Sequence, residues 1–190
     1  MANYTLSYLA GVDYWIEGCQ TAMFNFLLPV WNITSDQWNS YGRAYLNRSP
    51  KDDGYIPEVF VNGKDYSRDL FFNDKMAVTS FFVVTDEDMK DGNTYVKCQL
   101  LFFMNLSKIT PNGQAIITQR LDDVVVNDIT NFIKYNGGCN FTVKKVIKKT
   151  DKVLESFSGE FKRDVLKKNM QPLLALRFDL AFSYNNFLNQ

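Results

Sequence analysis

The stretch that decides the fold is "YVKCQLLFFMNLSKIT" at 95–110, in the middle of the chain. Its odd positions are mostly polar toward the two ends and become aliphatic or aromatic in the centre, at Leu101 and Phe103. Its even positions are apolar: Val96, Cys98, Leu100, Phe102, Met104 and Leu106. A period of two is typical of a strand, whereas a membrane helix needs ~20 apolar residues in a row. We therefore predict a long strand with one face on the core and the centre of its other face also covered.

The neighbouring segments extend this strand into a sheet. Residues 174–184 alternate in the same way, residues 76–85 are rich in β-formers, and residues 141–150 are β-prone and basic. Between them, apolar residues from Leu121 to Ile133 recur at helical spacing and form one stripe. Strands followed by a packed helix predict an α+β fold, with a mainly antiparallel sheet packed against a helix.

The N-terminal part has a different character. Apolar and aromatic residues at helical spacing predict a helix over 8–28, ended by Pro29. A short helix capped by Ser35 or Asp36 is predicted to run through Leu46, followed by a loop. We expect one domain over residues 1–190, with a helical, aromatic-rich arm and loop over 1–57 and an α+β core over 58–190.

Two short segments predict turns. Asn62-Gly63 lies between two β-prone arms, and both residues accept positive φ, as a tight hairpin requires. The segment "DEDMKDGN" at 86–93 is interpreted as a loop with a turn at Asp91-Gly92.

The totals are those of a soluble globular protein. Of 190 residues, 46% are hydrophobic and 22% charged, and a net charge of zero does not indicate nucleic acid or an anionic membrane as partner. The three cysteines are far apart, and Cys98 on the apolar face is expected to be a reduced core thiol. The N-terminal residues show no secretory pattern, so the protein is expected to be made and kept in a cytoplasm.

Charge is unevenly distributed along the chain. Residues 51–93 contain five basic and ten acidic residues, while residues 140–170 contain nine basic and four acidic residues. These blocks are either two separate solvated faces or complementary ends that stack on neighbouring molecules.

Catalytic signatures are missing. The chain has no histidine, the residue most often used for proton transfer near neutral pH, and no G-x-S-x-G, P-loop or G-x-G-x-x-G motif. The acidic string from Asp86 does not fit a calcium loop, because Asp91 stands where glycine is needed and Lys97 where glutamate is needed. We expect no enzymatic activity, no cofactor and no bound metal.

Several residues are candidates for interaction. Trp31, Trp38 and Tyr41 could pack inside the chain or contact another subunit. Leu101 and Phe103 could be covered by a neighbour or by the N-terminal arm, and Arg177 and Asp179 could form a surface ion pair or pair across subunits. A basic cluster either protects a strand edge or meets DNA phosphates: Lys144, Lys145, Lys148, Lys149 and Lys152.

Four strings occur in a recognisable order: "GKDYSRDLFFNDKMAVTSFFVV", "VKCQLLFFMNLSKI", "LDDVVVNDITNFI" and "MQPLLALRFDLAFSY". Together they resemble the neck or tail-connector proteins of tailed bacteriophages, especially crAss-like phages that infect gut Bacteroides relatives. The order of elements is also similar to the tail terminator fold. The resemblance covers residues 66–184, and the chain up to residue 57 departs from the minimal terminator fold.

The resemblance implies a structural virion protein. Such proteins form rings of six or twelve copies below the portal, join capsid to tail and surround the DNA channel. The expected partners are copies of itself and adjacent neck, tail or portal proteins, with non-specific contact to packaged DNA. The expected location is the virion, after assembly in the host cytoplasm. The alternative is a non-catalytic soluble binding module for an apolar ligand or a protein partner.

Overall fold

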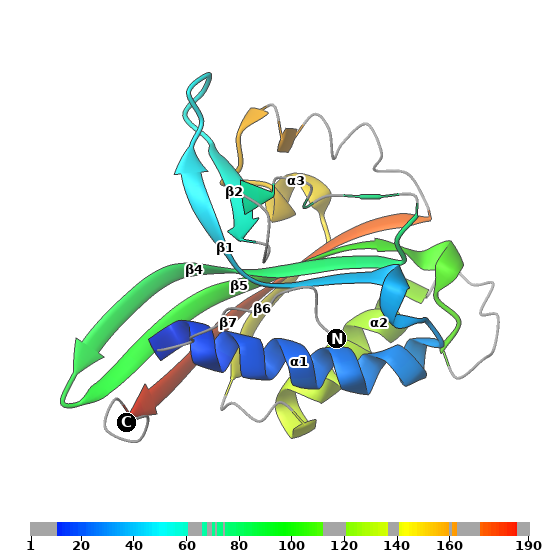
Figure 1. The fold of residues 1–190 in the computed structure, drawn as a ribbon, viewed down its shortest axis with the longest axis horizontal. Coiled ribbons are helices and arrows are strands. Elements are labelled where there is room, and N and C mark those ends of the chain that lie inside the picture. The colour runs from blue at the N-terminus through cyan, green and yellow to red at the C-terminus, as the bar shows by residue number, and fades with distance from the viewer. Residues whose placement is uncertain are drawn as a thin grey trace.

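The computed structural model describes residues 11–60, 66–67, 70, 72–73, 75–111, 121–136, 141–159, 161–162 and 172–185. Its strands form a sheet in the order β3-β2-β1-β4-β5-β7-β6 (Figure 1). The strands are β1 (Trp38–Arg48), β2 (Tyr55–Phe60), β3 (Tyr66–Ser67), β4 (Val78–Lys90), β5 (Asn93–Asn105), β6 (Thr142–Ile147) and β7 (Leu173–Asn185). The α-helices are α1 (Gly11–Trp31), α2 (Leu121–Asn131) and α3 (Thr150–Val153).

The sheet is mainly antiparallel. β5 pairs with β4 on one side and with β7 on the other over nearly its whole length, and both pairings are antiparallel. β1 and β4 pair in parallel, while β1–β2, β2–β3 and β6–β7 are antiparallel. The predicted α+β class, with helix packed on a mainly antiparallel sheet, is therefore confirmed.

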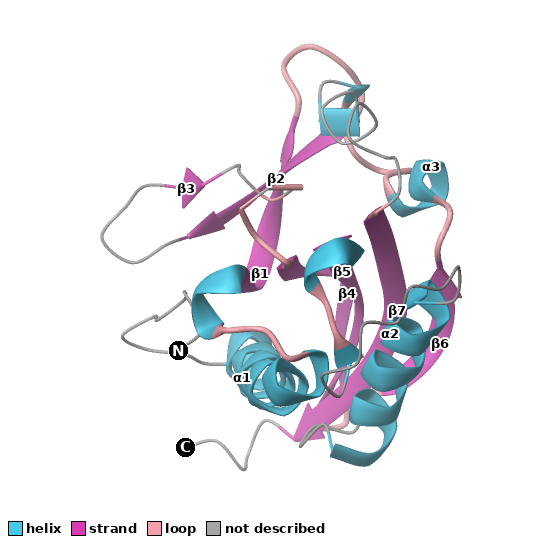
Figure 2. Ribbon diagram, turned by 90° about the vertical axis from the view of Figure 1, so that its right-hand side faces the viewer, coloured by secondary structure: helices cyan, strands magenta, loops and turns pink. Residues whose placement is uncertain are grey.

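One face of the sheet is covered by α1 and α2, which lie below the central strands in Figure 1 and in the lower half of Figure 2. The even positions of β5 point to this side, and Val96, Cys98 and Leu100 lie in the same apolar cluster as Ile129 of α2. The corresponding positions of β7, from Leu176 to Tyr184, join that cluster. The alternation in the sequence thus assigned the core face of both strands.

The opposite face carries a second apolar core. Leu101 and Phe103 are 0% and 2% exposed, and they belong to a separate cluster with residues of β1, β2, α3 and the segment after α3. Phe103 contacts Phe72 and Phe161, with ring centroids 5.4 and 6.4 Å away. The chain therefore covers these two residues itself, on the side away from α1. Their interpretation as contacts to a neighbouring subunit is not supported. Tyr41 and Ala44 of β1, which fall within the predicted arm over 1–57, are among the residues of this cluster.

α1 ends three residues later than predicted. Pro29 lies inside its last turn, where the missing N–H removes only the bond to the carbonyl of the exposed Asn25. The helix ends at Trp31, because Asn32 adopts φ +51° and the next amide, that of Ile33, returns to the Leu28 carbonyl at 3.2 Å. This is a Schellman ending, with asparagine in the position that glycine more often occupies.

The helix predicted to run through Leu46 is instead a short 3₁₀ turn, Ser35–Gln37, followed by β1. β1 lies between β2 and β4, with a bulge between Ser40 and Arg43. Together with α1 it belongs to the packed structure, so the described part of residues 1–57 is not an appended arm. Parallel pairing with β4, distant in the sequence, overrides the local helix signal here.

The 86–90 segment, interpreted as a loop, continues β4 as a strand. Its pairing runs without a break from Asp86 opposite Lys97 to Lys90 opposite Asn93. The turn at Asp91-Gly92 is confirmed, since both residues have positive φ, +52° and +77°. The second predicted turn, at Asn62-Gly63, lies outside the described residues, but the strands flanking it, β2 and β3, pair as a hairpin requires.

Candidate interaction surfaces

The tryptophans and Tyr41 are core residues. Trp31, Trp38 and Tyr41 are 0%, 1% and 8% exposed. The two indoles stack on each other at 5.3 Å, and each Nε1–H donates a hydrogen bond, from Trp31 to Asp128 and from Trp38 to Ser80. Burial raises the pKa of Asp128, against the opposing effect of the indole hydrogen bond. The chain itself satisfies these side chains, so their proposed role as subunit contacts is not supported.

Arg177 and Asp179 pair within the chain. Arg177 Nε lies 3.0 Å from Asp179 Oδ1, and Arg177 Nη1 donates to the Lys152 carbonyl at 3.0 Å. Arg177 is only 7% exposed, so its guanidinium joins β7 to the end of α3 instead of reaching another subunit.

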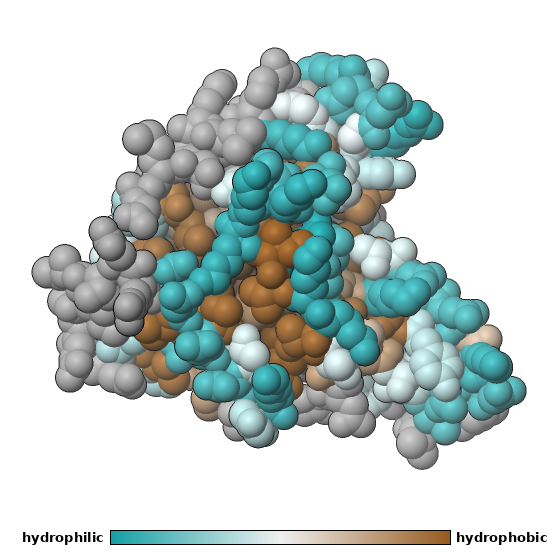
Figure 3. Space-filling view, turned by 180° about the vertical axis from the view of Figure 1, so that it is seen from behind, coloured by the Kyte–Doolittle hydropathy of each residue, from teal (hydrophilic) through white to brown (hydrophobic). Residues whose placement is uncertain are grey.

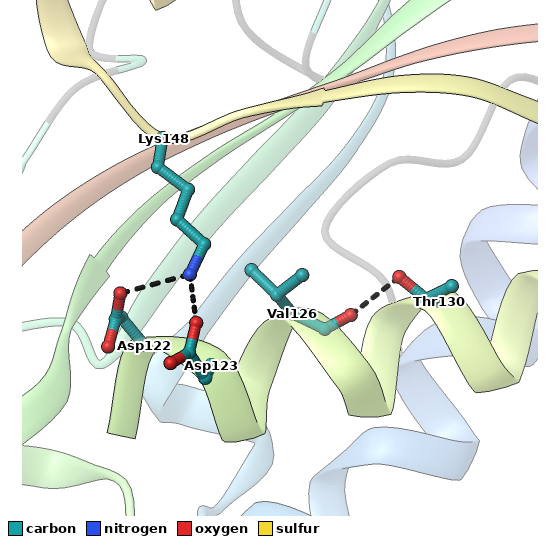
Figure 4. Close-up of polar contacts among 5 residues, drawn as sticks. All are labelled: Asp122, Asp123, Val126, Thr130 and Lys148. Carbon is teal, nitrogen blue, oxygen red and sulfur yellow. Dashed lines mark hydrogen bonds and ion pairs between the residues drawn. The ribbon is translucent and has the colours of Figure 1, made fainter. Parts of the chain in front are cut away.

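The basic cluster divides into two groups. Lys148 pairs with Asp122 and Asp123 in the first turn of α2 (Figure 4). Burial lowers the pKa of Lys148, but the hydrogen bonds to the two carboxylates outweigh it and the net shift is upward. Lys149 pairs with Asp151 and Lys152 with Glu155. A DNA phosphate approaching this group would meet carboxylates as well as ammonium groups, which weakens the DNA interpretation for these three lysines.

Lys144 and Lys145 form the second group. Both lie on β6, the strand at one end of the sheet order, and both are exposed. The pairing with β7 shifts between Val143 and Lys145, so Lys144 is the extra residue of a bulge. Neither lysine forms an ion pair with a residue that the structure describes. The alternative interpretation, a lysine-bearing sheet edge, fits the position of these two residues.

An acidic edge was not predicted from the sequence. We define it as residues 85–90 of β4, which are all exposed and carry three acidic residues, Asp86, Glu87 and Asp88, against one basic residue, Lys90. β1 pairs with β4 only as far as Phe82, so within the described chain this stretch pairs with β5 alone. The hairpin of β4 and β5 extends to the lower left in Figure 1, and its end is largely hydrophilic in Figure 3, at the lower right.

The acidic edge is only partly neutralised. Lys97 Nζ lies 2.7 Å from Asp86, and this hydrogen bond, together with the charge of Lys97, lowers the pKa of Asp86. Glu87 and Asp88 have no ion pair to any described residue. Met89 and Tyr95 beside them are 70% and 50% exposed, so large apolar groups accompany the charge.

The outer face of the same hairpin forms a shallow groove of about 380 Å³. Its lining comes from β4, β5, β6 and β7, and it includes Asp88, Lys97, Thr142 and Ser183. Tyr95 stands at one side of it. None of the residues that line the groove belongs to the second apolar core.

The described residues hold neither a cluster of metal ligands nor a membrane-spanning helix. No group of three or more cysteine, aspartate or glutamate side chains there could hold a metal ion. None of the described helices is long and apolar enough to cross a membrane. No protein family, curated protein or solved structure matches the chain.

Proposed function

We propose that this protein is a non-catalytic structural subunit of a phage neck or tail, which assembles with copies of itself into a ring between portal and tail. One observation supports the proposal most. The chain carries an acidic sheet edge, at 85–90, and a basic one, at Lys144 and Lys145, in different places. A ring built head to tail needs two different complementary surfaces on each subunit, and these two edges meet that requirement.

The ring would surround the DNA channel and contact adjacent neck, tail or portal proteins, as the resemblance in the sequence implies. Lys144 and Lys145 are the lysines of the basic cluster best placed for a phosphate or an acidic partner, because they have no carboxylate partner among the described residues. The protein would reach the virion after assembly in the host cytoplasm.

Imaging tests this proposal directly. Negative-stain microscopy of the purified protein, alone and with its neighbouring ring protein, should show closed rings, and immunogold labelling should place the chain at the neck or tail of virions. A 22.0 kDa monomer that is absent from virions would contradict the proposal.

The groove beside Tyr95 favours a second function, a non-catalytic binding module for a protein partner. Its lining includes Asp86, Asp88 and Lys97, so it suits a polar extended segment better than an apolar ligand. Capture of a defined partner by a monomer, lost on replacement of Tyr95 by alanine, would distinguish this function from ring assembly.

A further inference from the structure

We propose that two copies of this chain join through their sheets, with the acidic edge of β4 in one copy alongside the basic edge of β6 in the next. This inference deepens the proposed function and rests on it, because it requires self-assembly. In this contact the sheet continues from one subunit into the next, and charged residues on the two edges determine which strands pair.

Both strands present an edge that the described chain does not pair. β6 occupies one end of the sheet order, and its partner is β7. β4 leaves β1 after Phe82, so its edge from Val83 to Lys90 has no strand beside it in the described chain. Unpaired N–H and C=O groups on such edges are templates for another strand. The six residues of β6 are short enough to lie along the eight residues of β4 that follow Phe82.

Charge decides which edges can meet. Adjacent strands lie ~4.8 Å apart, so charged side chains on paired edges come close together. Two β6 edges would bring Lys144 and Lys145 against the same lysines, and two β4 edges would oppose Glu87 and Asp88 to themselves. Like charges opposite each other destabilise strand pairs, whereas opposite charges stabilise them. Of these three pairings, only the mixed contact of β4 with β6 brings opposite charges together.

The bulges in both strands are consistent with this selectivity. β4 shifts register between Val84 and Asp86, and β6 between Val143 and Lys145. Bulges and edge lysines ordinarily protect a sheet from pairing with arbitrary edges. The same lysines attract an acidic edge. They therefore disfavour pairing with another β6 edge and favour pairing with the acidic edge of β4.

Charge reversal tests the contact. Lys144→Glu with Lys145→Glu gives variant A, and Glu87→Lys with Asp88→Lys gives variant B. Each alone should weaken self-association by at least about tenfold, because like charges then face each other. An equimolar mixture of A and B should restore association, since each reversed edge then meets its complement. A control with the same charge change as variant A but away from both edges, Lys75→Glu with Lys134→Glu, should associate as the wild type does.

A second readout separates sheet formation from charge attraction alone. Hydrogen exchange on the assembled wild type should show slowed amide exchange at 85–90 and 142–147, because a new ladder ties up free amides. Unchanged association of variants A and B, or no slowing at those two segments, would overturn the edge contact even if rings are seen. A wild type that stays monomeric at every concentration and salt also overturns the contact, while virion labelling still decides the proposed function separately.

Discussion

Replacing Phe103 with alanine tests whether the second face of the sheet is a true core. The Phe103 ring is 2% exposed and contacts the rings of Phe72, Phe81 and Phe161 at 5.4, 6.1 and 6.4 Å. Removing a buried phenylalanine ring costs ~3–5 kcal/mol, out of a typical total stability of ~5–15 kcal/mol. With a urea dependence of ~2 kcal/mol/M, the unfolding midpoint should fall by about 2 M.

Urea denaturation of the monomer, followed by circular dichroism, measures this change. Tyr95→Ala is the matched control, because Tyr95 lies on the same strand and face but is 50% exposed. Its effect should stay within about 0.5 kcal/mol, as expected of an exposed residue. The reasoning fails if the free energy of unfolding of Phe103→Ala also stays within about 0.5 kcal/mol of the wild-type value and the variant loses only assembly. That result would mean that a neighbouring subunit covers Phe103.

Three further predictions concern local contacts. Ser80→Ala removes the acceptor that lies 2.9 Å from the buried Trp38 Nε1–H, so the free energy of unfolding should drop by ~1–3 kcal/mol. Urea titration measures this drop, and a loss below about 0.5 kcal/mol would mean that the hydrogen bond contributes little to stability. Gly54→Ala places a methyl group 2.3 Å from Ser158 Cα, so the two loops must separate, and a thermal melt should show a loss of ~1–3 kcal/mol; an unchanged melt would refute the close approach. The raised pKa of Asp128 favours its neutral form in the folded state, so wild-type stability should fall as pH rises from the ordinary aspartate value through the raised one. Asp128→Asn should remove that fall, and parallel stability-versus-pH curves for the two proteins would contradict the burial effect.

The sequence predicted the centre of the sheet well because its signal there is local. β5 and β7 keep apolar residues at every second position, and the stripe from Leu121 to Ile133 appears in the structure as α2 and the π-helical turn that follows it. Burial on one face produces the period that the sequence displays. The same logic identified Leu101 and Phe103 as covered, but periodicity does not say by what, so the second core could not be assigned to the chain itself.

The errors occurred where structure depends on distant pairing. β1 pairs in parallel with β4 some 40 positions later in the chain, and a local reading of its Trp- and Tyr-rich sequence favoured a helix. The outer half of β4 is exposed on both faces, so residues 86–90 show no apolar alternation at all. If the two strands are extended by equal lengths from the Asp91-Gly92 turn, residues 86–90 lie opposite residues 93–97. That pairing would have predicted the acidic edge.

The position of β7 constrains how the chain folds during synthesis. β7 is the last described strand in the sequence, yet it lies between β5 and β6. Until it emerges, β5 lacks its second partner and β6 has no neighbour in the sheet, so the apolar residues of both faces stay exposed. Non-local pairing of this kind folds slowly and exposes chains to aggregation. Cells making this protein would therefore depend on keeping the nascent chain soluble until β7 has left the ribosome.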